Sequence, residues 1–324
     1  MRPFLPSRRA LLLGLPALPL ARHARAALPG RPIRLVVGMP PGAVPDLLTR
    51  LLAERLQARL GRTLVVENRS GAAGNLAAAA LAHAAPDGGT IGTLLGATLA
   101  INRHLYPSLP FDPQHDFTPL VRFARFPGAV LTHPATPVET VEELGVWLRS
   151  LPRPALVATP GAGTVPHLAA EMLVRRLGAP AEMAHYRGDA DPLRDLAAGR
   201  VALMVAPLPG ALPQIAAGRA RGIAVTAPRR SALAPDLPAV AEILPDFEAQ
   251  SWLALGGPAG LPETVADRLS AALAEALADP ALRDRFAALG AEVAGETGEA
   301  LAATIAAEDA RWGAVIRAAG LRLE

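Results

Sequence analysis

The fold prediction starts from Ile33–Gly61, IRLVVGMPPGAVPDLLTRLLAERLQARLG. The unbroken apolar run Ile33–Val37 is typical of a strand that is covered on both faces. After a Gly/Pro loop, leucines recur every four residues and predict one face of a helix that ends at Gly61. These leucines are Leu48, Leu52, Leu56 and Leu60. Such a unit leaves N–H groups free at the helix start, where the helix dipole favours negative charge, so the stretch predicts an anion site.

A second unit of the same kind lies in the middle of the chain. The short apolar run Leu156–Thr159 is followed by the loop and helix pattern of residues 160–178. Thr164 is expected to be the N-cap, Pro166 is compatible with the first helical turn, and Gly178 is expected to end the helix. Two such loops predict two lobes that face a shared cleft. The alternative, that both are ordinary turns of an α/β protein, stays open at this point.

Strand-like and helix-like segments alternate through most of the chain, which favours an α/β fold with parallel sheets. Further strands are predicted at 63–66, 91–95, 201–205 and 223–226. Further helices are predicted at 76–85, 191–198 and 212–217. From Pro262 onward the pattern is helical to the end, with breaks near Pro280 and Gly290.

Residues 1–26 have the composition of an export signal. Arginines precede an apolar stretch, Ala10–Ala21, and Ala24-Arg25-Ala26 matches a small-x-small cleavage pattern. Ser7-Arg8-Arg9 resembles a twin-arginine signal, and a general secretory signal that carries two arginines is the alternative. The sequence therefore predicts an exported, periplasmic protein whose signal peptide is removed.

Charge and residue usage exclude several classes of protein. The formal net charge is +3, but residues 1–26 contain five arginines and no acidic residue, so the remaining chain carries about −2. This balance gives no support for a nucleic-acid partner. The chain has no lysine, which excludes a lysine Schiff base and a Walker-type phosphate loop. It has no cysteine, which excludes thiol nucleophiles, disulfides and cysteine-bound metals.

The motifs of common enzymes are absent from the sequence. There is neither an HExxH zinc motif nor a G-x-S-x-G elbow. The glycine pattern of residues 161–166 has Pro166 in place of the third glycine of a dinucleotide loop. Asp189, Asp191 and Asp195 lack the spacing of a calcium loop and are interpreted as acids at a helix N-terminus. No catalytic residue, cofactor or metal is predicted.

Taken together, nine motifs in this order make the chain resemble the exported solute-binding proteins of the tripartite tricarboxylate transporter group, often called Bug proteins. The resemblance runs from about Leu28 to the C-terminus. The motifs are RPIRLVVGMPPGAVPD, VVENRSGAAGN, AAPDGGT, LYPSLPFDPQHDF, ATPGAGTVPHLAAEML, HYRG, AVTAPRRS, LPAVAE and SWLALGGPAGLP.

The resemblance implies a two-lobed periplasmic binding protein fold of the type II-like flytrap kind, with a cleft between the lobes. Lobe 1 is expected to comprise residues 27–125 plus 228–324, and lobe 2 residues 126–227. The implied function is capture of a small organic carboxylate for a membrane permease by a monomer. The alternatives are a sensor or scavenger without a permease, an exported hydrolase or lyase that uses Asp46 or His167 as a base, and a structural protein with an empty cleft.

The resemblance also implies a set of ligand-binding residues on both lobes. On the first lobe these are Met39, Gly42, Ala43 and Asp46, together with Ala97 and Thr98 after the third strand. On the second lobe they are Thr159, Gly163, Thr164, His167, Tyr186 and Arg187.

This chain departs from the family pattern at several of these positions. The family usually has a glycine at Ala43, a threonine at Pro45, and often Asp-Asn where this chain has Ala206-Pro207. The substitutions remove polar groups from the expected cleft. Arg187 stands where lysine is common, and its planar guanidinium suits a carboxylate. These differences predict a ligand with one carboxylate and an apolar or aromatic body.

Overall fold

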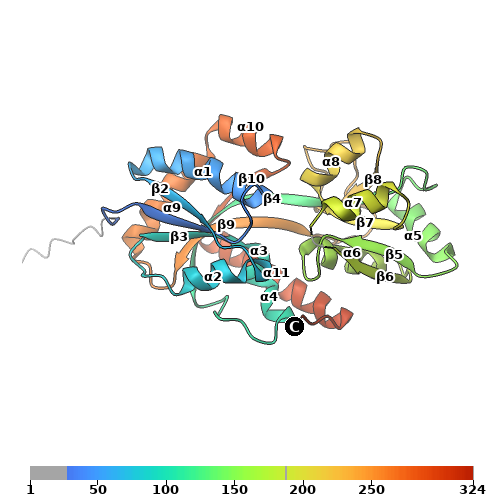
Figure 1. The fold of residues 1–324 in the computed structure, drawn as a ribbon, viewed down its shortest axis with the longest axis horizontal. Helices are drawn as coiled ribbons and strands as arrows, with labels where there is room; N and C mark the ends of the chain where they lie inside the picture. Colours follow the sequence, from blue (N-terminus) through green and yellow to red (C-terminus); the bar gives the residue numbers. More distant parts are fainter. Residues whose placement is uncertain (1–27, 187, 324) are drawn as a thin grey trace, which may run out of the picture.

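A computed structural model describes residues 28–186 and 188–323 as strands and helices that alternate along the chain (Figure 1). The strands are β1 (Ile33–Val37), β2 (Leu64–Asn68), β3 (Thr90–Leu95), β4 (Phe117–Thr132), β5 (Ala155–Thr159), β6 (Ala181–His185), β7 (Leu203–Pro207), β8 (Arg221–Val225), β9 (Gln250–Pro258) and β10 (Glu292–Thr297). The α-helices are α1 (Val44–Leu60), α2 (Asn75–Ala82), α3 (Gly96–Ala100), α4 (Asn102–Leu105), α5 (Val141–Ser150), α6 (Val165–Arg176), α7 (Ala190–Ala197), α8 (Leu208–Ala216), α9 (Glu263–Leu277), α10 (Pro280–Ala288) and α11 (Gly298–Ala319). Two short 3₁₀ turns lie at Ala72–Gly74 and Val240–Glu242.

The strands form two groups that are joined by the long strand β4. On one side, β2, β1 and β3 run parallel and β9 pairs antiparallel with β3. On the other side, β6, β5 and β7 run parallel. The first part of β4 pairs with β9 and β10, and its last residues pair with β7 and β8. Figure 1 shows the two groups as two bodies with β4 and β9 passing between them.

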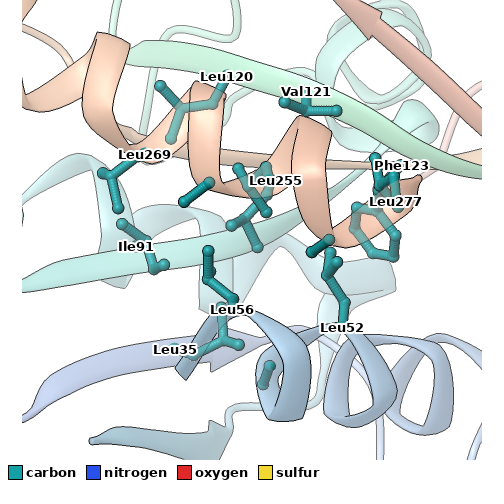
Figure 2. Packing of buried hydrophobic residues seen from close by; sticks show 14 of the residues in the cluster. Leu35, Leu52, Leu56, Ile91, Leu120, Val121, Phe123, Leu255, Leu269 and Leu277 are labelled. Carbon is teal, nitrogen blue, oxygen red and sulfur yellow. The ribbon is translucent and has the colours of Figure 1, made fainter. Parts of the chain in front are cut away.

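The predicted leucine stripe builds the core of the first group. Leu48, Leu52 and Leu56 of α1 are fully buried, and they pack with leucines of α9 over the sheet. Figure 2 shows this packing, with Leu35 of β1 and Ile91 of β3 near the leucines of α1 and α9, and with Phe123 of β4 beside α9. Gly61 ends α1 in the left-handed conformation, with φ at 60°. The local pattern therefore predicted both the helix and its buried face.

The helix α11 contacts both groups of strands. Leu301 near its start belongs to the cluster around α2 and β9, whereas Trp312 and Ile316 belong to a cluster with α5 and α6. Trp312 is fully buried, and its indole N–H donates to Glu308 Oε2 at 2.6 Å. The helix thus connects the two bodies independently of the strands.

The buried carboxyl of Glu308 makes stability depend on pH. Burial raises the pKa of Glu308, although Arg311 and the Trp312 N–H oppose the shift. An acid whose pKa is higher in the folded state binds its proton more tightly there. Its contribution is therefore fully present below the unfolded pKa, about 4.5, and is lost as pH rises through the folded value.

We expect the Glu308→Gln variant to lose this part of the pH dependence. Urea unfolding between about pH 4.5 and 8 measures it, as the difference in unfolding free energy between wild type and variant. Glu299→Gln, at the exposed start of the same helix, is the control and should leave the profile unchanged. Parallel profiles for wild type and Glu308→Gln would show that the carboxyl is not held in its buried state.

Several predicted elements are confirmed with small shifts in their ends. The strand Ile33–Val37 is reproduced without change, and Thr164 is the N-cap of α6 as expected. By contrast, Ala206 and Pro207 are the last residues of β7 rather than a loop after it. The helix α8 begins four residues earlier than predicted, because Pro209 lies in the first turn, where a missing N–H costs nothing.

Two expectations about the sheet need correction. The C-terminal part is not all helical, since β10 lies between α10 and α11 and pairs with β4. Nor is the sheet only parallel, because β4, β8, β9 and β10 form antiparallel pairs. Ion pairs from β4 hold β10: Arg122 Nη2 lies 2.5 Å from Glu296 Oε1, and Arg125 Nε lies 3.2 Å from Glu292 Oε2. A local pattern does not reveal such distant partners.

Two sequence predictions lie outside the described residues, namely the export signal at 1–26 and the role of Arg187. The lobe boundaries stay a prediction, since β4 and α11 both extend across the two bodies. Among residues 28–186 and 188–323, no helix combines the length and the apolar character needed to cross a membrane.

Candidate functional site

The loop between β1 and α1 is organised by the carboxylate of Asp46. This side chain is 1% exposed and accepts hydrogen bonds from Gly42 N at 2.9 Å, from Arg50 Nε at 3.0 Å and from Asn68 Nδ2 at 2.8 Å. The same Asn68 amide donates to Met39 O at 2.9 Å. Asp46 and Asn68 therefore fix both ends of the loop formed by residues 39–42. Asp46 acts here as a support of the loop, with its oxygens directed away from solvent.

These bonds also determine the ionisation of Asp46. Burial raises the pKa of this carboxyl, but the hydrogen bonds from Arg50, Asn68 and Gly42 together outweigh burial and hold the pKa below its ordinary value. The group is thus a carboxylate at neutral pH. Its negative charge lies in the first turn of α1, where it is stabilised by the helix dipole.

The start of α3 forms the neighbouring wall. Thr98 is buried, and Ala97 is partly buried against the cluster that contains Val165 and Leu168 of α6. The first residue of α3, Gly96, has to be a glycine, because a Cβ at this position would lie 2.4 Å from the indole of Trp252 on β9.

The second loop, residues 160–164, is closed by Thr164 at the start of α6. The Thr164 hydroxyl donates to Gly161 O at 2.8 Å and accepts from His167 N at 3.3 Å. Gly163 has φ at +75°, and a Cβ there would lie 2.7 Å from Leu323 Cδ1 and 2.8 Å from Leu105 Cδ1. The loop is therefore packed against α4 and the C-terminal segment.

Two histidines lie behind this loop. His167 is buried, and its Nδ1 lies 3.0 Å from Gly163 N. Its ring meets the ring of His185 edge to face, with centroids 4.5 Å apart. His185 Nδ1 in turn lies 2.8 Å from Thr159 Oγ1. Thr159 and His167 thus both contact His185, the first through a hydrogen bond and the second through its ring, inside the second body.

The hydroxyl of Tyr186 is also engaged within the protein. It donates to Asp195 Oδ2 at 2.7 Å, and this bond raises the pKa of Tyr186 so that the phenol stays protonated. Asp195 additionally accepts from Arg200 Nη1 at 2.9 Å. Of the predicted acidic cluster, Asp191 pairs with Arg194 on the surface of α7. The described residues contain no group of three or more metal-ligating side chains.

The largest described cavity does not coincide with the predicted site residues. A cavity of about 690 Å³ lies between α9, α10, β10 and residues 232–233, and its lining includes none of the predicted site residues. A narrow crevice lies where β4, β7 and β9 meet the start of α6. Val165, Pro166, Pro207 and Ser251 line it. The crevice adjoins the second loop. We therefore regard the crevice as the floor of the candidate site, in preference to the larger cavity.

Sequence reasoning missed three residues that shape the site: Asn68, His185 and Trp252. Asn68 and His185 end β2 and β6, the strands next to those that precede the two loops. Both occur in motifs that were noted for the resemblance, VVENRSGAAGN and HYRG. The signal that identifies them is their place at the carboxyl edge of a parallel strand, which becomes visible only once strand order is known.

We expect Thr164→Ala to weaken the second loop. The variant loses the side-chain cap of α6, worth about 1 kcal/mol of unfolding free energy, and also the bond to Gly161 O. Urea unfolding measures the first effect, and ligand titration of the folded variant measures the second. Thr140→Ala, which removes a similar cap from α5 far from the loop, is the control for stability without binding. Unchanged affinity in folded Thr164→Ala would argue against the loop as a binding element.

Comparison with known proteins identifies the family. The family model described as "Tripartite tricarboxylate transporter family receptor" matches residues 48–321. A solved structure from R. palustris, Rpa4515 with adipate, has 34% identity and a TM-score of 0.81, and the match covers 91% of this chain and 99% of that one.

Two further solved structures agree with this assignment. MatC (Rpa3494) from Rhodopseudomonas palustris with bound malate has 30% identity and a TM-score of 0.74, with 89% and 99% of the two chains covered. The periplasmic binding protein BugD has 31% identity and a TM-score of 0.77, with 91% and 100% covered. The predicted resemblance and the two-lobed binding-protein fold are confirmed, and the chain belongs to the receptor family of the tripartite tricarboxylate transporters.

Proposed function

We propose that this protein captures a small organic carboxylate outside the cytoplasmic membrane and delivers it to a membrane permease. The observation that carries the proposal is the pair of loops, residues 39–43 and 160–164, each at the N-terminus of a helix longer than ten residues. At α6, backbone N–H groups and the helix dipole favour an anion by about 0.3–1 kcal/mol, or up to ~2 when partly buried. At α1, the Asp46 carboxylate already uses the Gly42 N–H and the dipole, so the first loop contributes its other polar backbone groups. Membership of the receptor family and the adipate and malate complexes of similar proteins support it.

Binding of this kind is a shift between open and closed arrangements of the two bodies. A ligand that contacts both loops has more contacts in the closed form, so it favours closure. Met39, Gly42, Ala43, Ala97 and Thr98 provide the first wall in this proposal. Thr159, Gly163, Thr164 and Tyr186 provide the second wall, together with Arg187.

The location, the partner and the oligomeric state belong to the same proposal. The expected signal peptide and the periplasmic location of the similar BugD support export to the periplasm. The family name supports a permease as the partner. A sensor or scavenger without a permease is the second candidate. We propose that the protein is a monomer. We also propose that it binds its ligand without chemical change, because the two residues suggested as bases, Asp46 and His167, are both buried and engaged in internal hydrogen bonds.

A matched pair of ligands tests both the function and the ligand class. Adipate and hexanoate have the same chain length and differ in one carboxylate. A bound ligand raises the unfolding free energy by RT ln(1 + [L]/Kd), about 2.7 kcal/mol at a hundredfold excess over Kd. We expect a rise in Tm of the chain beginning at Ala27 with both ligands, and the larger rise with hexanoate, because the cleft is predicted to accept one carboxylate and an apolar body.

The outcomes separate the alternatives. A larger shift with adipate would overturn the single-carboxylate prediction while supporting carboxylate capture. No shift with any member of a panel of mono-, di- and tricarboxylates would contradict the proposed function. Recovery of the bound ligand unchanged after long incubation supports a binding protein, and its consumption would indicate an enzyme.

A further inference from the structure

A single imidazole, that of His167, accepts a hydrogen bond from the backbone of the second loop. His167 is 2% exposed, and its Nδ1 lies 3.0 Å from Gly163 N. A backbone N–H always donates, so Nδ1 is the acceptor and the neutral ring carries its proton on Nε2. The imidazole is therefore used as a hydrogen-bond acceptor for the loop.

Among the described residues, the bond with Gly163 N is the only hydrogen bond that the His167 ring makes. His167 Nε2 is buried and has no hydrogen-bond partner among the described residues, and Glu171 Oε1 lies 3.7 Å away, beyond hydrogen-bond distance. The ring of His185 meets it edge to face and holds its orientation. A buried N–H without a partner is costly, so an apolar side chain would suit this position better if the loop needed no acceptor.

Two leucines also contact Gly163. Leu105 of α4 and Leu323 of the C-terminal segment occupy the space where a Cβ of Gly163 would lie. Leu323 N donates to Leu105 O at 2.9 Å, which fixes these two leucines to each other. His167 thus bonds to the N–H of Gly163, and the leucine pair packs against its Cα.

We propose that His167 is a positioning residue for ligand capture. It does not touch the solute; it fixes the Gly163 peptide, and this sets the direction of the remaining N–H groups at the start of α6. The inference rests on the proposed function for its effect on affinity, whereas its effect on Gly163 is independent of any ligand.

Two amide variants distinguish positioning from packing. His167→Asn places its Oδ1 where Nδ1 lies, whereas His167→Gln carries its amide one carbon further and misses Gly163. Both variants lose the same ring packing on His185. With adipate as the probe, we expect His167→Asn to keep an affinity close to that of wild type and His167→Gln to lose about tenfold. Equal affinity in the two variants would overturn the proposal.

A matched control tests whether any histidine of this kind has the same effect. His133 Nδ1 accepts from Ala135 N at 3.1 Å, which is the same type of bond in a turn that precedes α5. His133→Gln should leave the adipate affinity unchanged. A loss as large as that of His167→Gln would attribute the effect to general destabilisation and would overturn the proposal.

Amide hydrogen exchange at Gly163 in the ligand-free protein completes the test. We expect the amide to be protected in wild type and His167→Asn, and to exchange about tenfold faster in His167→Gln. Equally fast exchange in all three proteins would overturn the proposal. If wild type binds no carboxylate, the proposed function fails, and the exchange measurement still decides whether His167 fixes Gly163.

Discussion

Replacing Trp312 with alanine is expected to lower the unfolding free energy by about 3–5 kcal/mol, the usual cost of removing a fully buried large aromatic side chain. Trp312 is fully buried in the cluster that joins α11 to α5 and α6. The variant also leaves the buried carboxyl of Glu308 without its indole donor. Urea unfolding of wild type and variant measures the loss.

The matched control is Trp147→Ala on α5. Trp147 is only partly buried against the same cluster, so its removal deletes the same atoms with less loss of packing. Trp312→Phe separates the two contributions, because it keeps an aromatic ring and loses the N–H. An equal loss for Trp147→Ala and Trp312→Ala would contradict the view that α11 is anchored to the second body by its tryptophan.

The second large effect is expected for Asp46→Ala, in ligand affinity as well as stability. Gly42 N and the Asn68 amide both lose their buried acceptor, and each hydrogen bond to a charged group is worth about 1.5–3 kcal/mol. Arg50 is 45% exposed, so its ion pair is screened by solvent and adds little. Because the loop of residues 39–42 loses its supports, we expect adipate affinity to fall about a hundredfold, which corresponds to about 2.7 kcal/mol.

The loss of stability caused by Asp46→Ala should vanish at low pH. A carboxyl whose pKa is lowered in the folded state contributes stability above its unfolded pKa of 3.8, and the contribution is lost as pH falls through the lower folded value. Asp87→Ala is the control, since Asp87 also accepts from a glycine amide and an arginine but is exposed and remote from the loop. Titration with adipate and urea unfolding measure both variants. Equal losses in the two would count against Asp46 as the support of the loop.

The sequence predicted those parts of the fold whose signals are local. Leucines every four residues and a terminal glycine define α1 without reference to any other element. The start of α8 was missed because Pro207 and Pro209 were interpreted as residues between elements, although a strand end accepts the first and a first helical turn the second. β10 was missed because its pairing partner is β4, which lies far away in the sequence and is joined to it by backbone pairing and by ion pairs.

The candidate site was also predicted only in part. The resemblance located both loops, and Thr164 was correctly assigned as a cap from its position before an apolar periodic segment. Asp46 and His167 were assigned as ligand contacts from the resemblance, which gives their positions in the loops and not the direction of their side chains. Their partners, Asn68 and Gly163, decide that direction, and Asn68 comes from a strand 22 residues away.

The contact between Leu323 and the second loop offers a route to an optical sensor. Leu323 lies against Gly163, and the neighbouring Arg322 is exposed. The chain has no cysteine, so a single cysteine introduced as Arg322→Cys would carry one environment-sensitive dye at one defined place. Such a dye would lie beside the second loop, where it would report on occupancy through the packing of the C-terminal segment.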